Sequence, residues 1–142
     1  MNNIDVYALC VKIMLFLNKN SCLSKSNLLY FISLSDFYAD GSMQNNNIKN
    51  INSFKFYSSQ MNNALAILLA TKLIEPYGYN YKLTASGSIF THNFSDNRKN
   101  QKLTEKIDYI QQNYVKETDL EKIYNELTIK FIESHIGGCY EN

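Results

Sequence analysis

The chain has 142 residues, of which 45% are hydrophobic and 19% are charged; this suits one folded domain with an appendage and argues against a disordered chain. Its 14 basic and 13 acidic residues give a formal net charge of +1, so no strong overall field attracts it to DNA or to an anionic membrane. Three cysteines in dissimilar contexts, Cys10, Cys22 and Cys139, are not the pattern of a secreted disulfide framework. The apolar run at 7–17 is interrupted by Lys12, is shorter than the ~20 residues that span a bilayer, and precedes no signal-peptide cleavage site. We therefore expect a soluble, cytoplasmic protein.

The first part of the sequence predicts two helices and a long loop. Residues 4–17 are apolar nearly all round, which is typical of a central, buried helix, and Cys10 should be a small buried hydrophobe within it. Ser24 is a suitable N-cap for a second helix that runs to about residue 34. Residues 36–53 hold Gly41 and a run of asparagines, and they predict a loop of a length that is usually functional or disordered.

A third helix and a hairpin follow the loop. Ser58 or Ser59 can cap a helix whose apolar residues fall at helical spacing on one face: Met61, Leu65, Leu68 and Leu69. Residues 76–83 predict a Tyr-rich hairpin, because Gly78 and Asn80 both tolerate the positive φ of a tight turn. Thr84 then caps a brief helix, and we expect Ile89 and Phe90 to pack inward from it.

The last part of the sequence predicts a linker and two helices. The polar residues 92–102 would join a domain at 1–91 to a helical appendage at 103–142. A capping box at Thr118 and Glu121 starts the last helix, and Gly137-Gly138 ends it. That helix has two apolar stripes, one formed by Leu120, Ile123, Leu127 and Phe131 and the other by Ile129, Ile132 and Ile136. One stripe can pack against Leu103, Ile107 and Ile110. The other would face a partner protein or a second copy of this chain, unless the domain core wraps both.

These elements together predict a mainly α (α+β) fold. It would be a winged-helix-like domain with one β-hairpin wing, a long loop between the second and third helices, and two C-terminal helices. Helix, hairpin and the pattern Y-x-L-T-x-x-G at 81–87 are typical of how winged-helix domains end.

The sequence offers no catalytic, metal or cofactor site. His92 and His135 lack a surrounding motif, and the metal-like spacing of His135 and Cys139 has no second pair to complete a zinc site. Gly137-Gly138 is not followed by the Lys-Ser/Thr of a phosphate-binding loop. We therefore predict that the chain is not an enzyme and needs no cofactor.

DNA binding is the natural alternative for a winged helix. The third helix of such a unit reads bases in the major groove, but here its polar face is neutral as far as Lys72, and the wing tip has no cation. Phosphate contacts supply most non-specific affinity, and the candidate donors are few: Lys72, Lys82, Arg98 and Lys99. The second and third helices are about twenty residues apart, against three or four in a DNA-reading unit. A DNA-binding transcriptional regulator is therefore the second interpretation.

Protein contacts are the first interpretation. Aromatic residues are enriched in interface cores, so Phe54, Phe56 and Tyr57 at the end of the loop are candidates, although they could instead complete a small core. Ile129, Ile132 and Ile136 are the candidates on the last helix.

Several segments, taken in order, resemble a known family. They are residues 5–9 (DVYAL), 12–18 (KIMLFLN), 23–31 (LSKSNLLYF), the long loop, 64–69 (ALAILL), 73–75 (LIE), 81–87 (YKLTASG) and the helical part at 103–114. This layout resembles the small middle component of bacterial three-component systems built around an SMC- or Rad50-like ABC ATPase, including the third subunit of Lamassu-type anti-phage systems. The loop departs from the family pattern because it is rich in Asn rather than aromatic and charged.

The resemblance implies a non-catalytic bridging subunit. It would connect an ATPase with a coiled coil to an effector, often a nuclease, in phage or plasmid defence. The partners would form a hetero-oligomer with this chain, and DNA would be touched only weakly or through the complex.

Overall fold

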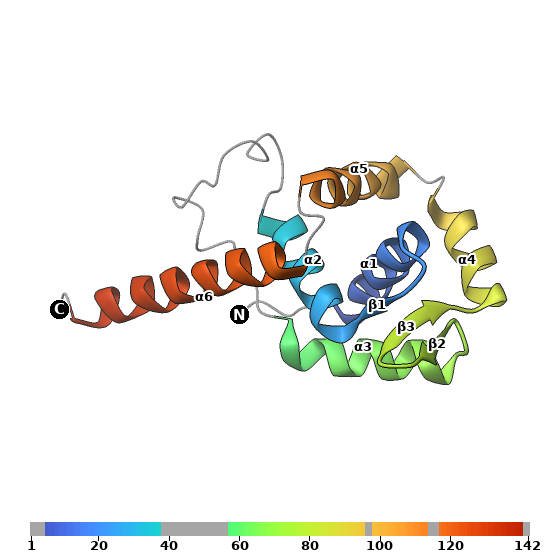
Figure 1. The fold of residues 1–142 in the computed structure, drawn as a ribbon, viewed down its shortest axis with the longest axis horizontal. Helices are drawn as coiled ribbons and strands as arrows, with labels where there is room; N and C mark the ends of the chain where they lie inside the picture. Colours follow the sequence, from blue (N-terminus) through green and yellow to red (C-terminus); the bar gives the residue numbers. More distant parts are fainter. Residues whose placement is uncertain (1–4, 38–56, 96–97, 114–116, 141–142) are drawn as a thin grey trace.

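The structure is a computed structural model that describes residues 5–37, 57–95, 98–113 and 117–140 (Figure 1). Helices dominate this part of the chain, and three short strands form one small antiparallel sheet. The fold is therefore the mainly α, winged-helix-like arrangement that the sequence predicts. The elements in order are α1 (Val6–Lys19), β1 (Leu23–Ser24), α2 (Lys25–Phe37), α3 (Ser58–Ala70), β2 (Ile74–Tyr77), β3 (Asn80–Leu83), α4 (Ala85–Ser95), α5 (Arg98–Asn113) and α6 (Glu117–Tyr140).

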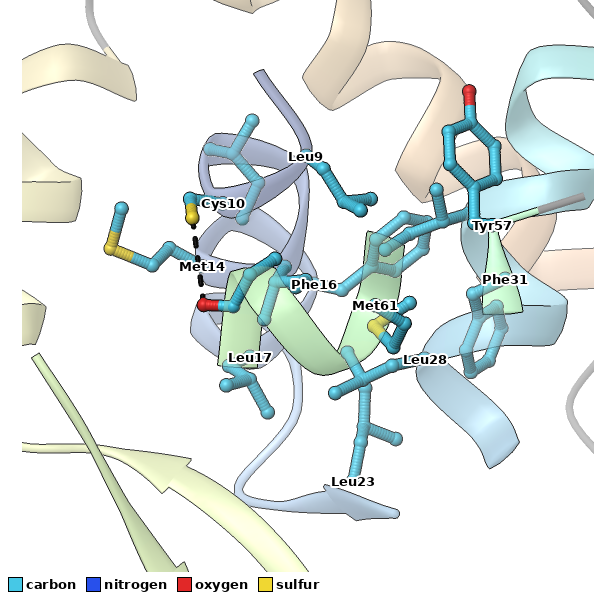
Figure 2. Close-up of a cluster of buried hydrophobic side chains, with 14 of the residues drawn as sticks. Leu9, Cys10, Met14, Phe16, Leu17, Leu23, Leu28, Phe31, Tyr57 and Met61 are labelled. Carbon is cyan, nitrogen blue, oxygen red and sulfur yellow. Dashed lines mark hydrogen bonds between the residues drawn. The ribbon is translucent and has the colours of Figure 1, made fainter. Parts of the chain in front are cut away.

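Helix α1 lies at the centre of the core, as predicted. Asp5 caps it by accepting a hydrogen bond from the backbone N–H of Tyr7 at 2.9 Å. The helix packs against α2, α3, α4 and α5, and seven of its residues are buried. Figure 2 shows Phe16 among Leu28, Phe31 and Met61; the Phe16 and Phe31 rings stack with their centroids 5.2 Å apart. A helix enclosed on so many sides must be apolar nearly all round, which explains its composition.

The sheet contains one strand more than the predicted hairpin. Strands β2 and β3 form the hairpin, and Gly78 takes the positive φ of its turn at +62°. Strand β1 pairs with the other edge of β3, with Leu23 opposite Tyr81, so the order is β1-β3-β2. Ser24 at the end of β1 accepts a hydrogen bond from the Asn27 N–H at 3.1 Å, which confirms it as the cap of α2. Two residues are too few to show strand periodicity in the sequence.

The start of α3 differs from the prediction. The N-cap position is taken by Tyr57, whose side chain does not cap the helix by a hydrogen bond, while the Ser59 hydroxyl donates to the side-chain oxygen of Gln60. The Tyr57 side chain is only 2% exposed, and Lys12 Nζ lies 5.5 Å from the centre of its ring. Tyr57 is therefore a core residue, and its assignment to an exposed docking surface is wrong. Phe54, Phe56 and the loop at 38–56 lie outside the described residues.

The pattern Y-x-L-T-x-x-G forms a joint between α3, the wing and α4. The Thr84 hydroxyl donates to the Lys72 carbonyl at 2.7 Å and accepts from the Gly87 N–H at 3.0 Å, which confirms Thr84 as the cap of α4. The Thr84 N–H donates to the Leu73 carbonyl at 3.1 Å. A Cβ on Gly87 would lie 1.9 Å from that same Leu73 oxygen, so only glycine lets α4 approach so closely.

This close approach also decides which face of α4 is buried. Gly87 and Thr91, four residues apart, are buried, and the Thr91 hydroxyl donates to the Gly87 carbonyl at 2.7 Å. Ile89 and Phe90 are instead 65% and 49% exposed. The prediction that they pack inward is therefore wrong.

The C-terminal helices belong to the same core as α1. Residues 92–95 end α4 and residues 98–102 begin α5, so most of the predicted linker at 92–102 is helical. Ile107 of α5 and Leu127 of α6 are buried in the core cluster that contains α1. Lys19 at the end of α1 pairs with Asp108 of α5 at 3.2 Å. The boundary predicted between a domain at 1–91 and an appendage at 103–142 therefore does not separate two cores.

Helix α6 packs differently from the prediction. Its main contacts are with α2 rather than with α5, and the rings of Tyr30 in α2 and Tyr124 in α6 lie 5.0 Å apart. The helix continues through Gly137 and Gly138 to Tyr140, so the predicted end at the glycine pair is wrong. Its C-terminal end extends away from the other helices (Figure 1).

Candidate partner-docking surface

Helix α3, which would read DNA in a helix-turn-helix protein, presents a neutral face. Its sequence, SSQMNNALAILLA, contains no charged residue. Its exposed side chains are small or polar: Ser59, Asn62, Asn63, Ala66 and Ala70. Asn can read adenine, but phosphate contacts, which supply most of the affinity of DNA-binding proteins, need cations. This face is therefore poorly suited to hold DNA by itself.

The cations predicted as DNA contacts lie on three different elements. Lys82 of β3 pairs with Glu75 of β2 at 3.4 Å, and its Nζ lies 4.7 Å from the centre of the Tyr77 ring. The charge of Lys82 therefore interacts with Glu75 and Tyr77 within the hairpin. Lys72 is exposed, at the end of α3. Arg98 and Lys99 begin α5, and their side chains lie outside the described residues.

The conformation of Lys72 gives it a structural role. Its φ is +60°, and its N–H donates to the Leu69 carbonyl while the Leu73 N–H donates to the Leu68 carbonyl. This pair of hydrogen bonds is the Schellman ending of a helix, in which glycine is the usual residue. The hydrogen bond from Thr84 to the Lys72 carbonyl adds a further constraint. The backbone of Lys72 therefore positions the wing, whatever its side chain binds.

One face of α6 packs against the body of the protein. Leu127 is 6% exposed, and three further residues pack against the core cluster: Ile123, Tyr124 and Phe131. Burial raises the pKa of the Tyr124 phenol, the nearby Tyr30 raises it further, and a side-chain hydrogen bond with Thr128 partly offsets these effects. Ile123, Leu127 and Phe131 belong to the first predicted stripe, and Tyr124 lies beside it.

The second stripe on α6 is exposed. Ile129, Ile132 and Ile136 are 56%, 49% and 48% exposed. At 3.6 residues per turn they lie nearly opposite Leu127. The alternative that the domain core wraps both stripes is therefore wrong for these three isoleucines. Contiguous exposed apolar side chains mark candidate protein-interaction sites, and these three isoleucines form such a row along one face of α6.

Other exposed apolar side chains occur on α4, on the wing and on α1. Ile89 and Phe90 of α4 are exposed, and the Phe90 ring lies edge to face with that of the half-buried Phe94, with the ring centroids 5.3 Å apart. Tyr79 at the wing tip is 98% exposed and Tyr7 of α1 is 69% exposed. Exposure of Ile89 and Phe90 was not predicted from the sequence. The signal for it is Gly87, because a small residue allows a close contact on its own side of α4 and so leaves the opposite side exposed.

The groups that could carry chemistry do not converge in the described ranges. Within 5–37, 57–95, 98–113 and 117–140, no three His, Cys, Asp or Glu side chains are placed to hold a metal ion. Cys10 is buried, as predicted; its thiol donates to the Ala64 carbonyl at 3.6 Å (Figure 2), and burial, with a smaller effect of Asp5, raises its pKa. The Cys22 sulfur accepts a hydrogen bond from the Asn80 amide at 3.4 Å.

Among the helices that the structure describes, none combines the length and apolar character needed to cross a bilayer. Comparisons with protein-family models, with curated proteins and with solved structures each found no match.

Proposed function

We propose that the chain is a non-catalytic bridging subunit that links an SMC- or Rad50-like ATPase to an effector of the nuclease class. It would act in the cytoplasm of a bacterium, in defence against phages or plasmids, as one component of a hetero-oligomer. The observation that carries the proposal is the exposed isoleucine stripe on α6, on the opposite side from the residues that hold this helix against α2. The resemblance of the sequence layout to middle components supplies the identity of the partners.

The neutral face of α3 supports a role in protein contacts. A bridging subunit needs at least two surfaces, and the structure offers the stripe on α6 and the exposed pair Ile89 and Phe90 on α4. In this proposal the α6 stripe contacts the ATPase. DNA would be contacted weakly or only through the complex, by Lys72 or by the basic residues at the start of α5.

The alternative is a winged-helix transcriptional regulator, which the fold itself favours. Such a protein binds its own operator tightly at physiological salt, with a Kd of about 10⁻⁸ M or lower, and the affinity falls steeply as salt rises. The neutral α3 and the ion pair between Lys82 and Glu75 argue against that behaviour.

Two measurements on the same material separate these functions. The tagged chain is expressed with its neighbouring genes and purified, and the proteins that accompany it are identified. The chain purified alone is then titrated onto DNA from its own promoter at physiological salt. We expect an ATPase with a coiled coil to co-purify and the isolated chain to leave promoter DNA unshifted at nanomolar concentration. A specific, salt-sensitive shift by the isolated chain would instead support the regulator.

A further inference from the structure

The exposed stripe on α6 follows the heptad spacing of a coiled coil. Ile129 and Ile136 are seven residues apart and Ile132 lies three after the first, which is the spacing of a and d positions. Carried toward the N-terminus, the same register places Lys122 at a and Asn125 at d, and both are exposed. We call these five residues the α6 seam.

The buried face of the helix fits the same register. With the α6 seam at a and d, the residues that pack on the body occupy the b, c and f positions: Ile123, Tyr124, Leu127 and Phe131. Positions b, c and f lie on the far side of a helix from a coiled-coil contact. The helix therefore has two apolar faces, one packed against α2 and the other formed by the α6 seam. A second helix could lie along the seam without displacing α2.

The residues that flank the seam are acidic. Glu126 and Glu133 occupy e positions and Glu121 occupies a g position, and all three are exposed. The other described g residue, Thr128, is half-buried, and its hydroxyl donates to the Tyr124 carbonyl. In a coiled coil the e and g side chains meet those of the partner and set which partner is accepted. Where side chains are described, this seam thus presents only negative charge at its edges.

These charges disfavour a second copy of the chain. Antiparallel pairing of two copies would bring Glu126 and Glu133 of one seam beside those of the other. Parallel pairing would bring Glu121 beside Glu126 and would place two Lys122 side chains opposite each other at an a position. Like charges placed together across an interface are unfavourable and suppress the wrong partner. A helix with Lys or Arg at its e and g positions would turn the repulsions between glutamates into attractions, and an apolar a residue on that helix would remove the contact between two Lys122 side chains.

We infer that the α6 seam docks one amphipathic helix of a different protein, which has apolar residues at a and d and basic residues at e and g. This inference rests on the proposed function and adds the kind of surface that the α6 partner brings to the complex. The occupant is a coiled-coil helix selected by charge, and the free chain is a monomer.

The test uses the full-length chain and two synthetic helical peptides. Both peptides have three heptads with Ile at a and Leu at d; one carries Lys and the other Glu at every e and g position. Binding is measured by fluorescence anisotropy at low and at high salt. We expect the chain to bind the Lys peptide at least about tenfold more tightly than the Glu peptide, since about 1.4 kcal/mol corresponds to that ratio. Added salt should reduce this difference in affinity between the Lys and Glu peptides, because it screens the charges.

A charge-reversed variant makes the test independent of folding. Glu126→Lys with Glu133→Lys should invert the preference, so that the Glu peptide binds more tightly, and a damaged fold cannot produce an inversion. Ile132→Asp should abolish binding of both peptides while the far-ultraviolet circular dichroism spectrum stays unchanged. Equal binding of the two peptides, binding of neither, or a wild-type chain that is dimeric by light scattering would overturn the inference.

The outcomes remain distinct from those for the proposed function. The peptide preference does not depend on the identity of the natural partner, so it can hold even if no ATPase co-purifies. If an ATPase co-purifies equally well with the wild-type chain and with the Ile132→Asp variant, the bridging role stands, but the contact through α6 and this inference both fail.

Discussion

Replacing Gly87 by Ala tests the joint between the wing and α4. The added Cβ would lie 1.9 Å from the Leu73 carbonyl oxygen and 2.9 Å from the Leu73 carbonyl carbon, so the backbone must move. That oxygen also accepts the Thr84 N–H at 3.1 Å, and the movement strains or breaks this hydrogen bond. Overpacking costs about 1–3 kcal/mol and a lost hydrogen bond about 0.5–1.5 kcal/mol. We expect Gly87→Ala to lower the free energy of unfolding by about 2–4 kcal/mol.

The assay is urea unfolding followed by circular dichroism, with Ser86→Ala as the matched control. Ser86 lies in the same first turn of α4 and is exposed, so its substitution should change the free energy of unfolding by less than about 0.5 kcal/mol. If Gly87→Ala is as stable as Ser86→Ala, α4 does not approach Leu73 as closely as the structure shows, and the explanation of the L-T-x-x-G pattern is refuted.

Three further predictions concern the same joint and the core cysteine. Lys72→Gly should raise the free energy of unfolding by roughly 0.5–1 kcal/mol in the same assay, because glycine takes a positive φ without the strain that Lys72 bears at +60°. Thr84→Ala should lower it by about 1–2 kcal/mol and Thr84→Ser by much less, since serine keeps the hydroxyl that bonds to Lys72 and Gly87. In the folded chain Cys10 should be alkylated far more slowly than Cys22, measured by mass spectrometry, because burial removes access and raises the Cys10 pKa. The raised pKa also means that the stabilisation from a neutral Cys10 is complete below the ordinary thiol pKa of 9.0 and is lost as pH rises through the folded value.

The elements with strong local signals could be predicted from the sequence. The apolar composition of residues 4–17 identified the central helix, which the structure places at Val6–Lys19. Ser24 and Thr84 were identified as caps because their residue type and position match a known hydrogen-bonding pattern. Gly78 marked the turn of the wing in the same way. The exposed stripe on α6 could also be predicted. Residues two apart on a helix point in nearly opposite directions, so Leu127 and Ile129 cannot both face the core.

The remaining features depend on contacts between distant parts of the chain. Strand β1 is two residues long and exists only because β3 passes beside it. Tyr57 is buried in the core cluster that contains residues of α1 and α3, and a single aromatic residue at the start of a helix does not reveal such long-range packing. Ile89 and Phe90 are exposed because Gly87 directs the other face of α4 inward. Helix α6 packs mainly against α2 rather than α5, and this too depends on tertiary packing, because both helices have apolar residues that α6 could contact.

The central claim is that the chain acts by docking a partner protein on α6. The most direct measurement co-expresses the tagged chain with its neighbouring genes and compares the wild type with an Ile129→Asp and Ile132→Asp double variant, using Ile89→Asp as the control for an exposed isoleucine elsewhere. About half of each α6 isoleucine remains to be buried, and full burial of such a side chain is worth about 1.5–3 kcal/mol. We predict that the double variant stays folded and monodisperse but captures at least about tenfold less of the ATPase, while Ile89→Asp captures it as the wild type does. A folded double variant that still captures its partner in full would contradict the account.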